Sequence, residues 1–134
     1  MKRFILTLFV FICVPAFGQY AIDTELEACH NDKNNQTTLG MVECERIALE
    51  AWDKVLNRHY RTLSDLLDKE GKDRLRSSQR KWIEYRDAEI NFSNGIYYGQ
   101  GGTMWNIAAA ARRADITRTR ALELQAYIDD LSGY

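Results

Sequence analysis

Apolar side chains recur at gaps of three, four and seven positions through residues 37–67. The positions are Leu39, Val42, Ile47, Ala51, Val55 and Leu63, with Trp52, Leu56, Tyr60 and Leu67 in adjacent places. This spacing places one apolar stripe along a long helix. Thr37 or Thr38 can cap its start, and Gly71 lies just past its expected end.

Three further helices are predicted by the same pattern. A helix over residues 73–92 has one face made of Leu75, Gln79, Trp82, Ile83, Arg86 and Ile90. A helix over residues 104–131 is expected to bury Leu124, Tyr127, Ile128 and Leu131. A short helix near residues 24–31 carries Cys29. The fold class is therefore all-α, with a short N-terminal helix followed by three longer antiparallel helices. Residues 93–103, which hold four glycines, are expected to form a loop before the last helix.

The first 18 residues have the composition of a secretory signal peptide. Lys2 and Arg3 precede an apolar run from residue 4 to 14, and the small residues Ala16 and Gly18 follow it. The run is too short to span about 30 Å of hydrocarbon. We expect cleavage after Gly18, which leaves residues 19–134 as a single domain in the periplasm or outside the cell, with no membrane insertion.

The cysteines agree with an oxidising compartment. Cys13 lies within the predicted signal peptide, so Cys29 and Cys44 are the pair that remains. An isolated pair in such a compartment is far more often a disulfide than a metal site. A zinc site would need further ligands, and only His30 and His59 are available. We therefore predict a Cys29–Cys44 disulfide and no metal or cofactor.

Charge and motifs exclude several functions. Removal of residues 1–18 leaves 16 basic against 19 acidic side chains, a net charge near −3. Nucleic-acid binding would require a concentrated basic face, so we expect none. The sequence holds no GxSxG, HExxH or glycine-rich phosphate loop. These observations argue against an enzyme.

Polar residues within the apolar faces are the first candidates for a site. Gln79, Trp82 and Arg86 follow one another along one helix face, next to Asp87. One interpretation is a ligand pocket in which Arg86 makes a cation–π contact with Trp82. The other, which we favour, is a polar clamp between helices, with Arg86 bonded to backbone carbonyls or a carboxylate.

The same two interpretations apply to residues on the other long helices. Asn57 lies beside the face of Leu56 and Tyr60 and could bond across to Arg86 or Gln79. On the last helix Thr117 and Arg120 are similarly placed. We again favour polar clamps.

Aromatic residues near the glycines are the second candidates. Tyr97, Tyr98 and Trp105 lie in or beside the expected loop. Tyrosines on a glycine-rich loop are well placed to bind a partner, although they could instead fold back over the end of the bundle.

The ordered set of these residues resembles the lysozyme-inhibitor LprI-like family of small exported bacterial proteins. The resemblance covers Cys29 to Leu124 and rests on Cys29, Thr38, Met41, Cys44, Leu56-Asn57, Tyr60, Gln79, Trp82-Ile83, Tyr85-Arg86-Asp87-Ala88, Gly101-Gly102-Thr103, Thr117, Arg120 and Leu124. Members of that family commonly carry a second cysteine pair. Here those places hold residues such as Glu89 or Ile90, and Ala111 or Arg112, so we expect a less restrained loop.

The resemblance implies a binding protein that inhibits lysozyme or another cell-wall hydrolase. Because lysozyme places two carboxylates in a deep cleft, an inhibitor must occlude that cleft. The Tyr97–Tyr98 segment is the one we expect to do so. Two alternatives stay open: an envelope-maintenance or small-ligand-binding protein with a pocket at Gln79, Trp82 and Arg86, and an immunity protein against a wall-degrading toxin.

Overall fold

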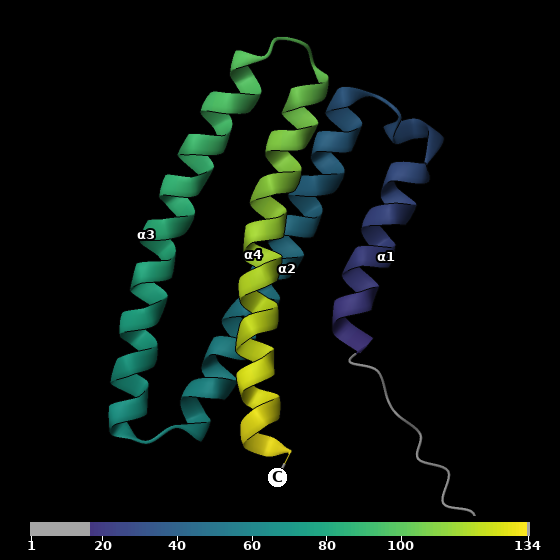
Figure 1. Cartoon of the computed structure of the whole chain (residues 1–134). Coiled ribbons are helices and arrows are strands. Elements are labelled where there is room, and N and C mark those ends of the chain that lie inside the picture. Colours follow the sequence, from purple (N-terminus) through teal and green to yellow (C-terminus); the bar gives the residue numbers. More distant parts are fainter. Residues whose placement is uncertain (1–16, 134) are drawn as a thin grey trace, which may run out of the picture.

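The computed structural model describes residues 17–133, and its elements are all helical. They are α1 (Phe17–Asn31), the 3-10 helix η1 (Lys33–Asn35), α2 (Thr38–Leu66), α3 (Lys69–Gly99) and α4 (Met104–Ser132) (Figure 1). The all-α prediction is confirmed. The predicted signal peptide lies outside the described residues except for its last two positions. No helix among the described residues is long and apolar enough to cross a membrane.

Both ends of α2 lie within one residue of the expected 37–67, whereas α3 begins at Lys69 and not near Asp73. Thr37 caps α2 by accepting a hydrogen bond from the Gly40 amide at 3.0 Å. Gly71 lies past the end of α2, as expected, but it belongs to the first turn of α3 and not to the connection. The reason is Asp68, whose side chain accepts a hydrogen bond from the Gly71 amide at 2.8 Å and caps a helix that begins at Lys69.

The expected loop over residues 93–103 is wrong in its first seven positions. Helix α3 continues through Gly95 to Gly99, and only the four residues 100–103 connect it to α4. Gly101 and Gly102 have φ values of 70° and 93°, which break the helix. Gly95 and Gly99 remain helical because one glycine costs a helix only about 1 kcal/mol.

The core lies between α2 and α4, which run in the same direction with α3 antiparallel to both (Figure 1). Its buried members are Trp52, Val55, Leu56, Leu63, Leu75, Ala121, Leu124 and Ile128. Helix α1 packs on α2 and α3 packs on α4, on opposite sides of the central pair. Helix α1 begins at Phe17 rather than near Thr24, since Ile22 extends its apolar face onto the core.

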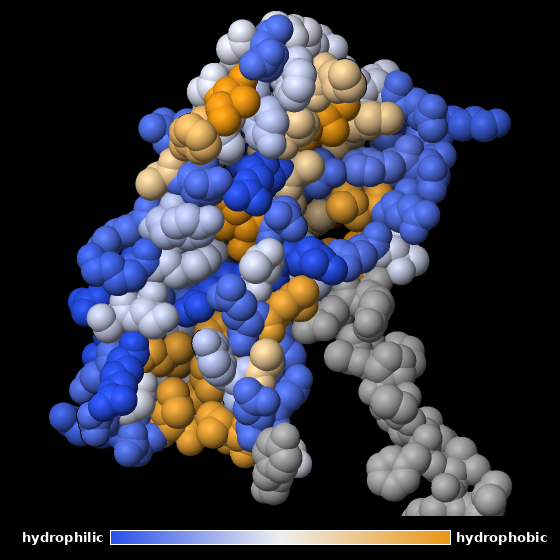
Figure 2. All heavy atoms as spheres, viewed as in Figure 1, coloured by the Kyte–Doolittle hydropathy of each residue, from blue (hydrophilic) through white to orange (hydrophobic). Residues whose placement is uncertain are grey.

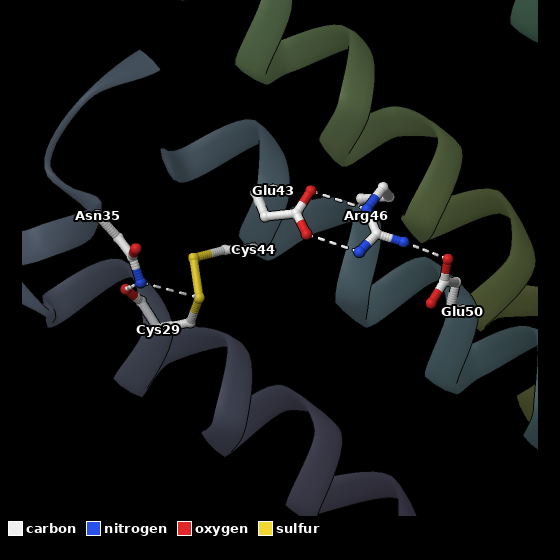
Figure 3. A network of polar contacts seen from close by, with 6 residues as sticks. All are labelled: Cys29, Asn35, Glu43, Cys44, Arg46 and Glu50. Carbon is white, nitrogen blue, oxygen red and sulfur yellow. Dashed lines mark hydrogen bonds and ion pairs between the residues drawn. A yellow bond between two sulfur atoms is a disulfide. The ribbon is translucent and has the colours of Figure 1, made fainter. Parts of the chain in front are cut away.

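The predicted disulfide is confirmed. Cys29 at the end of α1 and Cys44 in the second turn of α2 are joined with a Cα–Cα distance of 5.8 Å (Figure 3). Asn35 of η1 donates a hydrogen bond to the Cys29 carbonyl at 3.1 Å. Gly40 is required for this turn, because a Cβ there would lie 2.6 Å from the Asn35 carbonyl oxygen.

Candidate functional site

The connection between α3 and α4 forms an end of the molecule that we call the α3–α4 tip (residues 96–105). The Tyr97 and Trp105 rings stack across it with centroids 5.9 Å apart and planes at 21°. Tyr98 and Met104 are 53% and 70% exposed. The Tyr98 hydroxyl accepts a hydrogen bond from Arg113 at 3.4 Å. The tyrosines therefore lie on the last turns of a helix, not on a loop as expected. Tyr97 stacks on Trp105, and Tyr98 is about half exposed, with its hydroxyl on Arg113 of α4.

Trp82 and Arg86 make the expected contact with each other. The Arg86 guanidinium lies 5.3 Å from the centre of the Trp82 ring. Its nitrogens donate to the carboxylate of the adjacent Asp87 at 2.7 and 2.9 Å. The partner is a carboxylate, as one interpretation expected, but it belongs to the same helix. Arg86 therefore does not fasten α3 to a neighbour.

Gln79 and Arg120 are brought together across α3 and α4. Arg120, which is buried, donates to the Gln79 side-chain oxygen at 3.2 Å and to the Ser78 hydroxyl at 3.1 Å. It also pairs with Glu123 at 3.0 Å. This polar contact lies beside an apolar groove of about 400 Å³ lined by Leu63, Leu75, Leu131 and neighbouring residues. Figure 2 shows the apolar surface between the lower ends of α3 and α4.

Asn57 does not make the predicted contact between helices. It is exposed, and its amide donates to the backbone and side-chain oxygens of Asp53 on the same helix, at 2.8 and 3.0 Å. Tyr60 is half-buried and packs against the core. Thr117 is buried and bonds the Arg113 carbonyl one turn earlier on α4. The expectation of one polar set that joins Asn57, Gln79 and Arg86 is therefore wrong.

Other polar contacts between helices were not predicted. His59 of α2 lies 2.8 Å from the Ala121 carbonyl oxygen of α4. Arg118 of α4 binds Asp23 of α1 at 2.7 Å and lies over the Trp52 ring. Periodicity places each of these side chains on a helix face, but it does not say which helix lies opposite.

Glu89 of α3 and Arg112 of α4 contact each other. The family resemblance named both among the positions where a second cysteine pair was expected and is missing here. Their side chains form an ion pair at 2.8 Å. Hydrogen bonding to Glu89 is the main cause that raises the pKa of Arg112. A polar contact thus connects α3 and α4 at these positions.

A groove lies between α2, α3 and α4 in the middle of the molecule. It measures about 430 Å³ and includes Arg86 but neither Gln79 nor Trp82. The pocket expected at those three residues is therefore not formed as one site. Among residues 17–133 no group of three or more His, Cys, Asp or Glu side chains is arranged to hold a metal ion.

Comparison with known proteins agrees with this helical frame. A family model described as lysozyme inhibitor LprI matches residues 29–124. The chain belongs to the LprI lysozyme-inhibitor family. The match begins at Cys29 and ends at Leu124 of the buried core. It therefore covers the disulfide, the three candidate aromatic residues of the tip and the Gln79–Arg120 contact.

A crystal structure gives a second comparison for this LprI-family chain. An uncharacterized protein from Burkholderia thailandensis matches it with a TM-score of 0.76 and 26% sequence identity. The match covers 84% of this chain and 55% of the other. The LprI-family chain thus spans about half the length of that protein. No curated protein matches it significantly.

Proposed function

We propose that this protein is an exported binding protein that inhibits lysozyme and so protects the cell wall. The observation that carries the proposal is membership of the LprI family over most of the chain. The scaffold suits inhibition by occlusion, because a disulfide and a continuous α2–α4 core hold the helices in place. Its action is binding and not catalysis.

The α3–α4 tip is the surface we propose to enter the lysozyme cleft. A deep cleft is best filled by a convex element, and the tip is the point at which the chain reverses between two long helices (Figure 1). Aromatic and methionine side chains are enriched in protein interfaces, and tyrosine is a frequent anchor there. Tyr98 and Met104 are exposed residues of these types. Each is next in sequence to a member of the Tyr97–Trp105 stack, which holds the ends of α3 and α4 together.

Charge supports the same partner class. The predicted mature chain has a net charge near −3. A negative inhibitor is attracted to a basic enzyme, which raises the association rate at low ionic strength. We therefore expect inhibition of basic lysozymes to weaken as salt is added.

The experiment measures lysis of a bacterial cell-wall suspension by several types of lysozyme, with protein purified after export. We expect Tyr98→Ala and Met104→Ala each to raise the inhibition constant about tenfold or more. The control is Tyr127→Ala, since Tyr127 is 55% exposed, close to the 53% of Tyr98, and lies near the other end of α4.

The two parts of the proposal fail separately. If no lysozyme binds the wild-type protein or is slowed by it, the inhibitor function is wrong. If inhibition is present but equally strong in both tip variants and in the Tyr127 control, the function stands and the α3–α4 tip is the wrong surface.

A further inference from the structure

The α2–α3–α4 groove has the size of a small-molecule site. Its volume of about 430 Å³ lies within the range of pockets that hold small ligands. Helix α3 packs on α4 and makes few contacts with α2. This leaves a groove between α2 and α3 that residues of all three helices line. Leu49 and Ile90 give the groove an apolar part.

Six charged side chains line the groove, and their formal charges sum to zero. Three are cations and three are carboxylates: Lys54, Arg86 and Arg113, and Glu50, Asp53 and Asp87. The carboxylates all have partners within their own helix. Glu50 pairs with Arg46, Asp53 accepts from Asn57, and Asp87 pairs with Arg86.

Arg113 is a cation of this lining whose bonding is incomplete. Its Nη2 donates to two neutral groups, the Asn94 amide oxygen at 3.2 Å and the Tyr98 hydroxyl at 3.4 Å. Its Nε is buried and has no hydrogen-bond partner among the described residues. A buried donor without a partner is costly, and a guanidinium can bind a carboxylate through two parallel hydrogen bonds. Nε itself has almost no accessible surface, so the atoms that Arg113, a lining residue of the groove, can offer to an oxyanion are its Nη groups.

We propose that the groove binds a zwitterion, namely an amino acid or short peptide with free termini. Its carboxylate binds Arg113, and its ammonium group lies toward Glu50 and Asp53. A ligand without net charge matches a lining of three cations and three carboxylates, whereas the carboxylates repel a compact dianion such as phosphate. Leu49 and Ile90 contact the side chains of the ligand. The groove adjoins the tip, because Arg113 donates to the Tyr98 hydroxyl, but the proposed ligand is a small molecule and not lysozyme.

Calorimetric titration of the purified protein with dialanine tests the proposal. The L,L and D,D forms are compared, because protein fragments supply the first and cell-wall peptides the second. Binding of either form supports the site, and the tighter one identifies the source. We expect affinity to fall at least tenfold when the carboxylate is amidated or the amino group acetylated, and phosphate to bind more weakly than dialanine.

Two variants locate the binding. Arg113→Gln should weaken dialanine binding at least tenfold, and Asp53→Asn should weaken it to a smaller extent. Lys81→Gln is the charge-matched control, because Lys81 is exposed and pairs only with Glu84 on the same helix. That control should bind like the wild type.

Several results would overturn the proposal. They are no binding of either dialanine at millimolar concentration, equal binding of the amidated or acetylated forms, tighter binding of phosphate, or an unchanged affinity in Arg113→Gln. If Arg113→Gln does not fold, the amidated and acetylated ligands still decide the question on the wild-type protein.

Discussion

At the scale of single residues, Glu45 is a buried carboxyl group next to the disulfide. It is 5% exposed, and its Oε1 lies 3.3 Å from the His30 Nε2. Burial raises the pKa of the Glu45 carboxyl, and the charge of His30 acts in the opposite direction. A carboxyl whose pKa is higher in the folded than in the unfolded chain destabilises the fold above its folded pKa. That penalty disappears as the pH falls below the unfolded value of about 4.3.

Glu45→Gln should therefore raise the melting temperature at pH 7, with a gain that shrinks as the pH falls from the folded pKa toward 4. Thermal unfolding across that range measures it. Glu43→Gln is the control, since hydrogen bonding to Arg46 lowers the pKa of Glu43 and its ionised form favours the fold. A Glu45→Gln variant that is no more stable than wild type at pH 7 would show that His30 fully compensates the burial.

Arg120 is a buried cation whose loss should be costly. Arg120→Ala leaves Gln79 and Ser78 without their partner between α3 and α4, and we expect a loss of about 2–3 kcal/mol in the free energy of unfolding. Urea unfolding measures this. Arg76→Ala, which breaks an exposed ion pair with Asp73 on the same helix, should cost less than about 1 kcal/mol. Equal losses in the two variants would contradict a structural role for the buried contact.

The sequence identified Arg120 and Gln79 as unusual, but not as partners. A polar side chain on an apolar helix face must find a hydrogen bond, and this requirement can be read locally. The partner lies 41 positions away on another helix, and its identity depends on how α3 and α4 are rotated against each other. Asn57 met the same requirement within its own helix, so the local rule alone could not separate the two outcomes.

At the scale of helices, the glycines between residues 93 and 103 fall into two kinds. Gly95 is helical, and a Cβ there would meet nothing within 4 Å, so Gly95→Ala should stabilise the protein by about 0.5–1 kcal/mol. Gly101 also has open space, but its φ is 70°, so Gly101→Ala should destabilise it by about 1 kcal/mol. Chemical denaturation of both variants checks the signs. Destabilisation by Gly95→Ala would place the true end of α3 before residue 95.

Helix bounds were predictable where one signal dominated. The start of α2 was found from a threonine cap and an apolar stripe, and α4 was found from its glycine pair and the spacing of its second half. The end of α3 was missed because each glycine lowers helix stability by an amount that packing can exceed. The stack of Tyr97 on Trp105 is such a contact, and it forms only once α4 has turned back along α3.

At the scale of the whole molecule, the fold class follows from the sequence, whereas the arrangement of the helices does not. The apolar stripes predicted only part of the buried faces. Val55, Leu63, Leu124 and Ile128 lie in the core as expected. The expected burial of Tyr127 and Leu131 is wrong, since both are more than half exposed, and Leu39 and Ile47 at the other end of the stripe on α2 are exposed as well. The arrangement depends on contacts between distant segments, such as Arg118 with Asp23, which lie 95 positions apart. The α2–α3–α4 groove is a product of that arrangement, because α3 packs on α4 and leaves α2 uncovered on one side.

The disulfide should stabilise the molecule as a whole, mainly by restricting the unfolded chain. It closes a 15-residue separation between Cys29 and Cys44, so changing both cysteines to serine should lower the free energy of unfolding by about 2–5 kcal/mol.

Helix α1 keeps its Ile22 packing and the Arg118–Asp23 ion pair without the bridge. We therefore expect a cooperative transition at lower temperature and faster amide exchange in α1 than in α2 and α4. Wild-type protein under reducing conditions should behave like the serine variant. Unchanged stability of both would mean that contacts of α1, and not the covalent bond, hold the N-terminal helix to the bundle.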